Sequence, residues 1–93
     1  MLAMRFEWDE RKRLSNLEKH GVSLSEGDGV LNDPLGRTME DELVEGEQRF
    51  VTLGNNAFGA LMVVVWTSRD ENIRLISVRR ADPRERRNYE EGL

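Results

Sequence analysis

Residues 73–85 have the sequence IRLISVRRADPRE, which joins a strand pattern to a helix start. Apolar and β-branched side chains dominate as far as Val78, as is typical of a buried strand. Arg79 and Arg80 then end the strand. Cationic side chains at the end of a rigid strand predict an anion site. We therefore expect the rest of the chain to hold this basic edge in place.

A helix is predicted directly after this strand. Asp82 stands at the N-cap, Pro83 at the first helical position and Glu85 at N3, which together form a capping box. The helix is expected to end near Glu91. It carries Arg84, Arg86, Arg87 and Tyr89. Because few of its side chains are apolar, we expect it to be weakly anchored.

Two further strands are predicted upstream. Residues 60–67 are apolar on both alternating faces, which indicates a central strand covered on both sides. Residues 49–53 form a shorter strand pattern, and the polar residues 68–72 are typical of a hairpin loop. With residues 73–81, these segments predict a three-stranded meander.

The N-terminal part predicts a strand followed by two helices. Residues 4–8 alternate apolar and charged side chains, as in a half-buried strand. Asp9 is a good N-cap for a helix over about residues 10–20. Residues 23–26, SLSE, form a second capping box, so a short helix should follow and stop before Pro34.

Residues 35–48 show no clear period and hold an acidic block, which we expect to be a turn with an irregular or short edge segment. The block consists of Glu40, Asp41, Glu42, Glu45 and Glu47. A carboxylate magnesium site is one interpretation, but a solvated loop or a surface for a basic partner fits better. The pattern predicts a small α+β fold, in the order β-α-α-β-β-β-α, with an antiparallel sheet of about four strands.

Composition limits the classes of function. The 93 residues predict one domain over residues 1–93, and the absence of cysteine excludes disulfides and thiolate metal sites. The net charge of −4 argues against a general nucleic-acid binder, but the arginines gathered in residues 73–93 can form a local positive face. No secretory or membrane-spanning segment is visible, so we expect a cytoplasmic protein with no membrane partner. No motif predicts a metal or any other cofactor.

Three side chains of the first predicted helix are candidates for chemistry. His20 can change its charge near neutral pH, and Lys19 stands beside it. Lys12 lies seven residues before Lys19, so the two share one helix face. The simpler interpretation is that Lys19 and His20 serve the helix dipole and that the lysines are solvated.

The two arginines of the strand cannot both point to one face. Side chains of adjacent strand residues alternate, so Arg79 and Arg80 should diverge unless the strand bulges or ends there. One of them is a candidate for binding phosphate. The simpler alternative is a salt bridge to Asp82 or Glu85.

Lysine, histidine, arginine and tyrosine without metal ligands suit RNA cleavage. The 2′-hydroxyl of RNA is the nucleophile, so the protein needs only a proton acceptor, a proton donor and cations for the phosphate. Arginine matches phosphate oxygens well. These residue types permit ribonuclease activity without being specific for it.

The motifs resemble those of BrnT-family toxins along nearly the whole chain. The N-terminal motifs are F-x-W-D-x-x-K over residues 6–12, Asn16, KHGVS over residues 19–23 and NDP over residues 32–34. The others are Glu47, Arg49, VVVWT over residues 63–67, IRLISVRRA over residues 73–81 and RERR-x-YE over residues 84–90.

The resemblance implies a RelE-like fold and the toxin of a bacterial type II toxin–antitoxin pair. The implied activity is a metal-independent endoribonuclease that arrests translation and is neutralised by a BrnA-type antitoxin. DNA would be contacted only through the antitoxin, and a toxin dimer within the complex is a further expectation. On this basis the catalytic candidates are His20, Lys19, Arg79 and Arg80, and the RNA-binding candidates are Lys12, Arg84, Arg87 and Tyr89. The alternative is a non-catalytic module that sequesters an antitoxin and acts as co-repressor of the operon.

Overall fold

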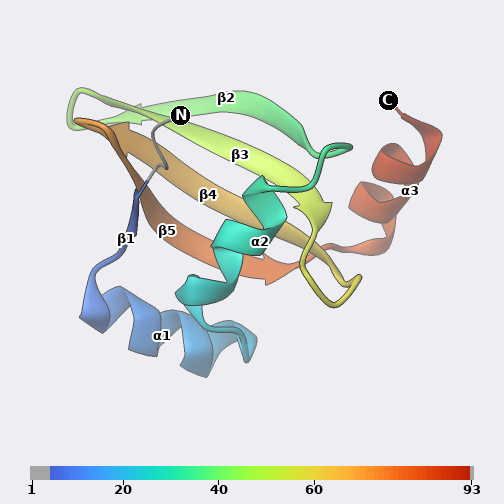
Figure 1. The fold of residues 1–93 in the computed structure, drawn as a ribbon, viewed down its shortest axis with the longest axis horizontal. Coiled ribbons are helices and arrows are strands. Elements are labelled where there is room, and N and C mark those ends of the chain that lie inside the picture. The colour runs from blue at the N-terminus through green and yellow to red at the C-terminus, as the bar shows by residue number, and fades with distance from the viewer. Residues whose placement is uncertain (1–4, 93) are drawn as a thin grey trace.

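A five-stranded mixed sheet forms the centre of the part of the chain that the computed structural model describes, residues 5–92 (Figure 1). Its strand order is β1-β5-β4-β3-β2. The elements are β1 (Arg5–Glu7), α1 (Glu10–His20), the 3₁₀ turn η1 (Leu24–Glu26), α2 (Gly27–Leu31), β2 (Arg37–Val44), β3 (Glu47–Asn55), β4 (Leu61–Arg69), β5 (Asn72–Arg80) and α3 (Pro83–Glu91). The α+β class and the meander of β3, β4 and β5 are confirmed.

The expected antiparallel sheet of about four strands is corrected in two ways. First, β1 pairs in parallel with β5, with Phe6 opposite Ile73, so the sheet is mixed. This pairing joins residues 5–7 to residues 72–74, and the hydropathy pattern of neighbouring residues does not reveal it. The predicted strand over residues 4–8 is β1, and Met4 lies outside the described residues.

The second correction is that β2 is an edge strand of eight residues where a turn with an irregular or short edge segment was expected. It pairs antiparallel with β3, with Arg37 opposite Leu53, and carries an irregularity between Glu40 and Leu43. As the outermost strand it is exposed on both faces along most of its length, which removes the apolar alternation that marks a strand. The acidic residues 40–42 therefore stand on the open edge of the sheet.

The main core lies between one face of the sheet and the segment that contains η1 and α2. Leu24 and Val30 are fully buried there against Leu75 and Val78. A Cβ atom on Gly27 would lie 3.1 Å from the Leu75 side chain, so the glycine permits the close approach of α2 to β5. The expected second helix thus exists, but begins as a 3₁₀ turn.

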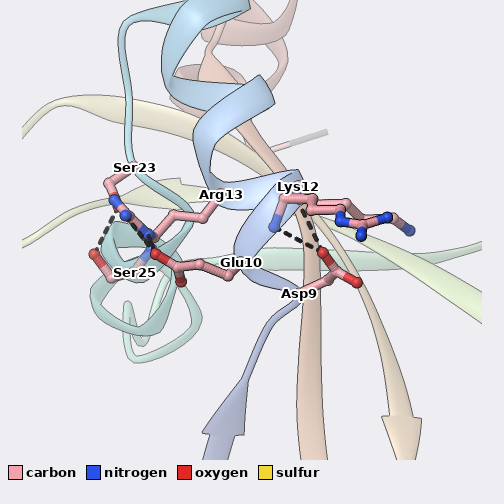
Figure 2. A network of polar contacts seen from close by, with 7 residues as sticks. Asp9, Glu10, Lys12, Arg13, Ser23 and Ser25 are labelled. Carbon is pink, nitrogen blue, oxygen red and sulfur yellow. Dashed lines mark hydrogen bonds and ion pairs between the residues drawn. The ribbon is translucent and has the colours of Figure 1, made fainter.

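The predicted ends of α1 are confirmed. Asp9 accepts hydrogen bonds from the backbone N–H groups of Arg11 and Lys12 at 2.8 and 3.3 Å (Figure 2). These bonds lower the pKa of the Asp9 carboxyl, that from Lys12 most. Gly21 ends the helix in the left-handed conformation, with φ of 69°.

Asn16 joins α1 to the edge of β5. Beyond the residues that pair with β1, this edge has no neighbouring strand in the described chain, and α1 lies beside it (Figure 1). The Asn16 amide takes the strand's place: Nδ2 donates to the Val78 carbonyl at 2.7 Å and Oδ1 accepts from the Val78 N–H at 3.1 Å. Nδ2 also donates to the Val22 carbonyl at 2.7 Å. This buried side chain therefore fixes α1, the following loop and β5 together.

We expect Asn16→Ala to lower the free energy of unfolding by roughly 2–4 kcal/mol, because it leaves buried backbone groups of Val22 and Val78 without partners. Urea denaturation measures the change. Glu18→Ala, an exposed change on the same helix, is the control and should shift stability by less than about 0.5 kcal/mol. An Asn16→Ala protein as stable as the control would contradict the assigned role.

Candidate functional site

Three of the predicted site residues line one groove between α1 and β5, here called the α1 groove. Its volume is about 220 Å³. Its lining consists of Lys12, Ser15, Asn16, Lys19 and His20 from α1 and of Ile76 and Ser77 from β5. The shared helix face predicted for Lys12 and Lys19 is thus confirmed, and His20 lies in the same groove.

The α1 groove presents donors and titratable groups without a carboxylate in its lining. Lys12, Lys19 and His20 are exposed to solvent, whereas Asn16 at its base is buried. Two cationic side chains can attract a phosphate, and a histidine can exchange a proton near neutral pH. The hydroxyls of Ser15 and Ser77 add hydrogen-bonding groups. This combination suits phosphodiester chemistry.

Arg79 does not line the α1 groove and is held by another element. Its two terminal nitrogens each donate to a Glu85 carboxylate oxygen at 2.8 Å, which fixes the start of α3 to the sheet. This contact lowers the pKa of Glu85 and raises that of Arg79. The salt-bridge alternative stated for Arg79 is thus the geometry observed.

Tyr89 likewise holds α3. Its hydroxyl donates to Asp33 Oδ2 at 2.7 Å and accepts from Asn55 Nδ2 at 3.1 Å. The neighbouring Asp33 carboxylate raises the pKa of Tyr89, so the phenol keeps its proton. The pKa of Asp33 is lowered, chiefly by the hydrogen bond from the Asn55 N–H. Tyr89 was expected to contact RNA, but its hydroxyl donates one hydrogen bond and accepts another within the fold.

The remaining candidates lie away from the α1 groove. Arg80 is exposed at the end of β5, and Arg84 and Arg87 are exposed on α3. None of the three lines the α1 groove. The structure thus divides the predicted set into an α1 group (Lys12, Lys19 and His20) and a group at β5 and α3 (Arg79, Arg80, Arg84, Arg87 and Tyr89).

Sequence reasoning missed the polar residues that complete the α1 groove. Ser15 and Ser77 are common surface types, and only the placement of α1 beside β5 brings them together. Asn16 was noticed only as part of the family motif. The helix pattern did not mark it, because apolar residues such as Leu14 and Leu17 would be expected to face the core, whereas they are 53% and 43% exposed and Asn16 is 5% exposed.

In residues 5–92, no three histidine, aspartate or glutamate side chains are grouped as a metal site requires, and this includes the acidic block of β2. No helix in the same range is long and apolar enough to cross a membrane.

A family profile described as "Ribonuclease toxin, BrnT, of type II toxin-antitoxin system" matches residues 8–85. The chain belongs to this family. It is accordingly a BrnT ribonuclease toxin of a type II system, which implies an RNA substrate and a cognate antitoxin. The resemblance seen in the motifs is thereby confirmed.

The BrnT fold is also confirmed by a solved structure. The crystal structure of the Brucella abortus ribonuclease toxin BrnT matches with a TM-score of 0.69 and 22% identity. The match covers 86% of this chain and 99% of that one. No curated protein sequence matches the chain significantly.

In this BrnT chain, the contact between Arg79 and Glu85 should stabilise α3 only while Glu85 is ionised. Because folding lowers the pKa of Glu85, the contribution is complete above the ordinary glutamate pKa of about 4.3 and is lost as pH falls through the lowered value. At pH 7 the free energy of unfolding of wild type should exceed that of Glu85→Gln by about 1 kcal/mol or less, since Arg79 is partly exposed and solvent weakens the ion pair. Urea denaturation should show this difference shrinking below about pH 4.

Glu91→Gln is the matched control, because Glu91 is an exposed acid at the other end of α3. Its difference from wild type should be small at every pH. If the difference for Glu85→Gln is the same at pH 7 and pH 3, the ion pair does not act as described.

Proposed function

We propose that this BrnT toxin cleaves RNA in the α1 groove without a metal ion. The observation that carries the proposal is the convergence of Lys12, Lys19 and His20 on one groove that also holds two hydroxyls. Among the predicted residues, these are the ones brought together around an open space whose lining includes no acid. Family membership supplies the reaction class, and the groove supplies suitable groups.

The reaction needs two proton transfers. The 2′-hydroxyl of RNA loses its proton as its oxygen bonds to phosphorus, and the 5′-oxygen gains a proton as its bond to phosphorus breaks. We assign these transfers to His20 and Lys19, which are adjacent at the end of α1. Lys12 is assigned to the phosphate oxygens, where negative charge develops in the transition state.

The arginines receive different roles in this proposal. Arg79 positions α3, because Glu85 occupies its guanidinium. Arg80, Arg84 and Arg87 are exposed and are assigned to contacts with the RNA backbone outside the α1 groove. Tyr89 serves as an anchor of α3, since its hydroxyl is bound on both sides.

We further propose that the cognate antitoxin is of the BrnA type and that cleavage arrests translation in the cytoplasm. The support is the family membership of the chain. The acidic net charge of −4 agrees with DNA contact through the antitoxin alone.

Replacing either proton-transfer candidate should abolish toxicity. We expect His20→Ala and Lys19→Ala to lower the single-turnover rate of RNA cleavage by about 10²–10⁴-fold, the usual contribution of a general acid or base. Growth arrest on expression should be relieved in parallel. Arg11→Ala is the control, because Arg11 is an exposed cation of α1 that does not line the groove.

The free energy of unfolding must be measured for each variant, so that loss of activity is not loss of fold. If folded His20→Ala and Lys19→Ala proteins both cleave RNA at the wild-type rate, the site is not the α1 groove.

Metal independence is tested separately. The cleavage rate of wild type should be the same with excess chelator as with added Mg²⁺, because the proposed groups transfer protons directly. A rate that falls more than about tenfold in chelator and recovers with one added cation would contradict this part of the proposal.

A second candidate function, a binding module that only sequesters the antitoxin, is favoured by one observation. Within the described helix α3, no residue is fully buried, so this helix would gain stability from a partner. If the wild-type protein binds the antitoxin but cleaves neither free nor ribosome-bound RNA, the binding function is supported and the proposed ribonuclease activity is rejected.

A further inference from the structure

A second groove lies on the other face of the sheet, between the strands and α3; we call it the sheet–α3 groove. Its volume is about 320 Å³, larger than that of the α1 groove. Its lining consists of Arg37 and Met39 from β2, Val51 and Leu53 from β3, Val63 from β4 and Glu85 and Asn88 from α3. Because strand side chains alternate, these positions point away from the core that holds Met62 and Val64.

The floor of the sheet–α3 groove is apolar and incompletely covered. Val51 and Leu53 are only half-buried, and Met39 is 69% exposed. The described residues of α3, Pro83–Glu91, cover one end of this face, but none of them is fully buried. Apolar surface left open beside polar groups is typical of a site that binds another protein.

One charged group in this groove lacks an acceptor. Arg37 Nη1 is buried and has no hydrogen-bond partner among the described residues. Glu85, the acid that lines the same groove, already accepts hydrogen bonds from Arg79 and from the Asp82 N–H. Nη1 itself is covered by protein, so a carboxylate placed in the groove would meet the rest of the Arg37 guanidinium, whose charge is not paired by an acid among the described residues.

We propose that the sheet–α3 groove is the docking site of the cognate antitoxin. The occupant is an amphipathic segment that places apolar side chains on Met39, Val51 and Leu53 and one acidic side chain on Arg37. Charge complementarity selects an acid at that position, and the apolar floor selects a protein rather than RNA, which carries a phosphate on every nucleotide. The proposal rests on the family's need for an antitoxin.

This assignment separates the antitoxin from the proposed catalytic groups. No residue that lines the sheet–α3 groove also lines the α1 groove. The segment would contact α3 directly, through Glu85 and Asn88. Release of the antitoxin would therefore uncover the sheet–α3 groove and leave the residues that line the α1 groove unchanged.

Binding of the purified cognate antitoxin provides the test. We expect Arg37→Glu and Met39→Asp to raise its Kd roughly 10- to 100-fold, because they remove the charge match and the apolar contact. Arg11→Glu and Leu14→Asp are matched controls on exposed positions of α1 and should bind like wild type. Met39 is exposed on the edge strand, so its variant is expected to fold; Arg37→Gln provides a milder change if Arg37→Glu does not.

Cleavage and growth arrest without the antitoxin are measured on the same variants. The expected result is that Arg37→Glu and Met39→Asp remain toxic but escape neutralisation. Wild-type Kd values for both folded variants would overturn the docking site and leave the ribonuclease proposal untouched. Variants that keep antitoxin binding but lose cleavage would show an RNA surface instead, which also overturns it. An inactive wild type would count against the proposed function alone, because the binding measurement does not depend on cleavage.

Discussion

The amide of Asn16 does for β5 what a neighbouring strand would do. A sheet edge leaves backbone donors and acceptors unpaired, and burying them without partners is unfavourable. Asn16 supplies both a donor and an acceptor to Val78, and its second donor bond fixes Val22. Helix α1 consequently lies against the strand through a polar contact, while Leu14 and Leu17 remain exposed. The position of the α1 groove follows from this contact, because the same helix and strand line it.

The two sides of the sheet are stabilised in different ways. One side carries the apolar core, with Leu24 and Val30 packed on the strands. The other side holds α3 through polar contacts: the Arg79–Glu85 pair at its start and the Tyr89 hydroxyl near its end. Elements attached in this way can open locally at a lower free energy than the core requires. A partner that acts on α3 would therefore not need to disturb the packed side.

Features of the fold that depend on neighbouring residues were predicted from the sequence, whereas features that depend on distant partners were not. The helix caps at Asp9 and Asp82 and the apolar run of β4 depend on neighbouring residues, so they could be predicted. The parallel pairing of β1 and the strand β2 depend on distant partners or on an exposed edge, so they could not. The candidate site followed the same division. The spacing of Lys12 and Lys19 predicted their shared face, whereas their meeting with Ser77 required the position of α1 beside β5.

The acidic edge strand has a consequence for the toxin at high concentration. An open strand is a template on which a second copy can add, and β2 has exposed Met39 and Leu43 that would favour such stacking. The carboxylates at residues 40–42 oppose it, because two copies that meet edge to edge would bring like charges together. The irregularity between Glu40 and Leu43 further interrupts the row of backbone groups. The chain therefore carries its own protection against self-assembly into extended sheets, one that salt or acid would weaken.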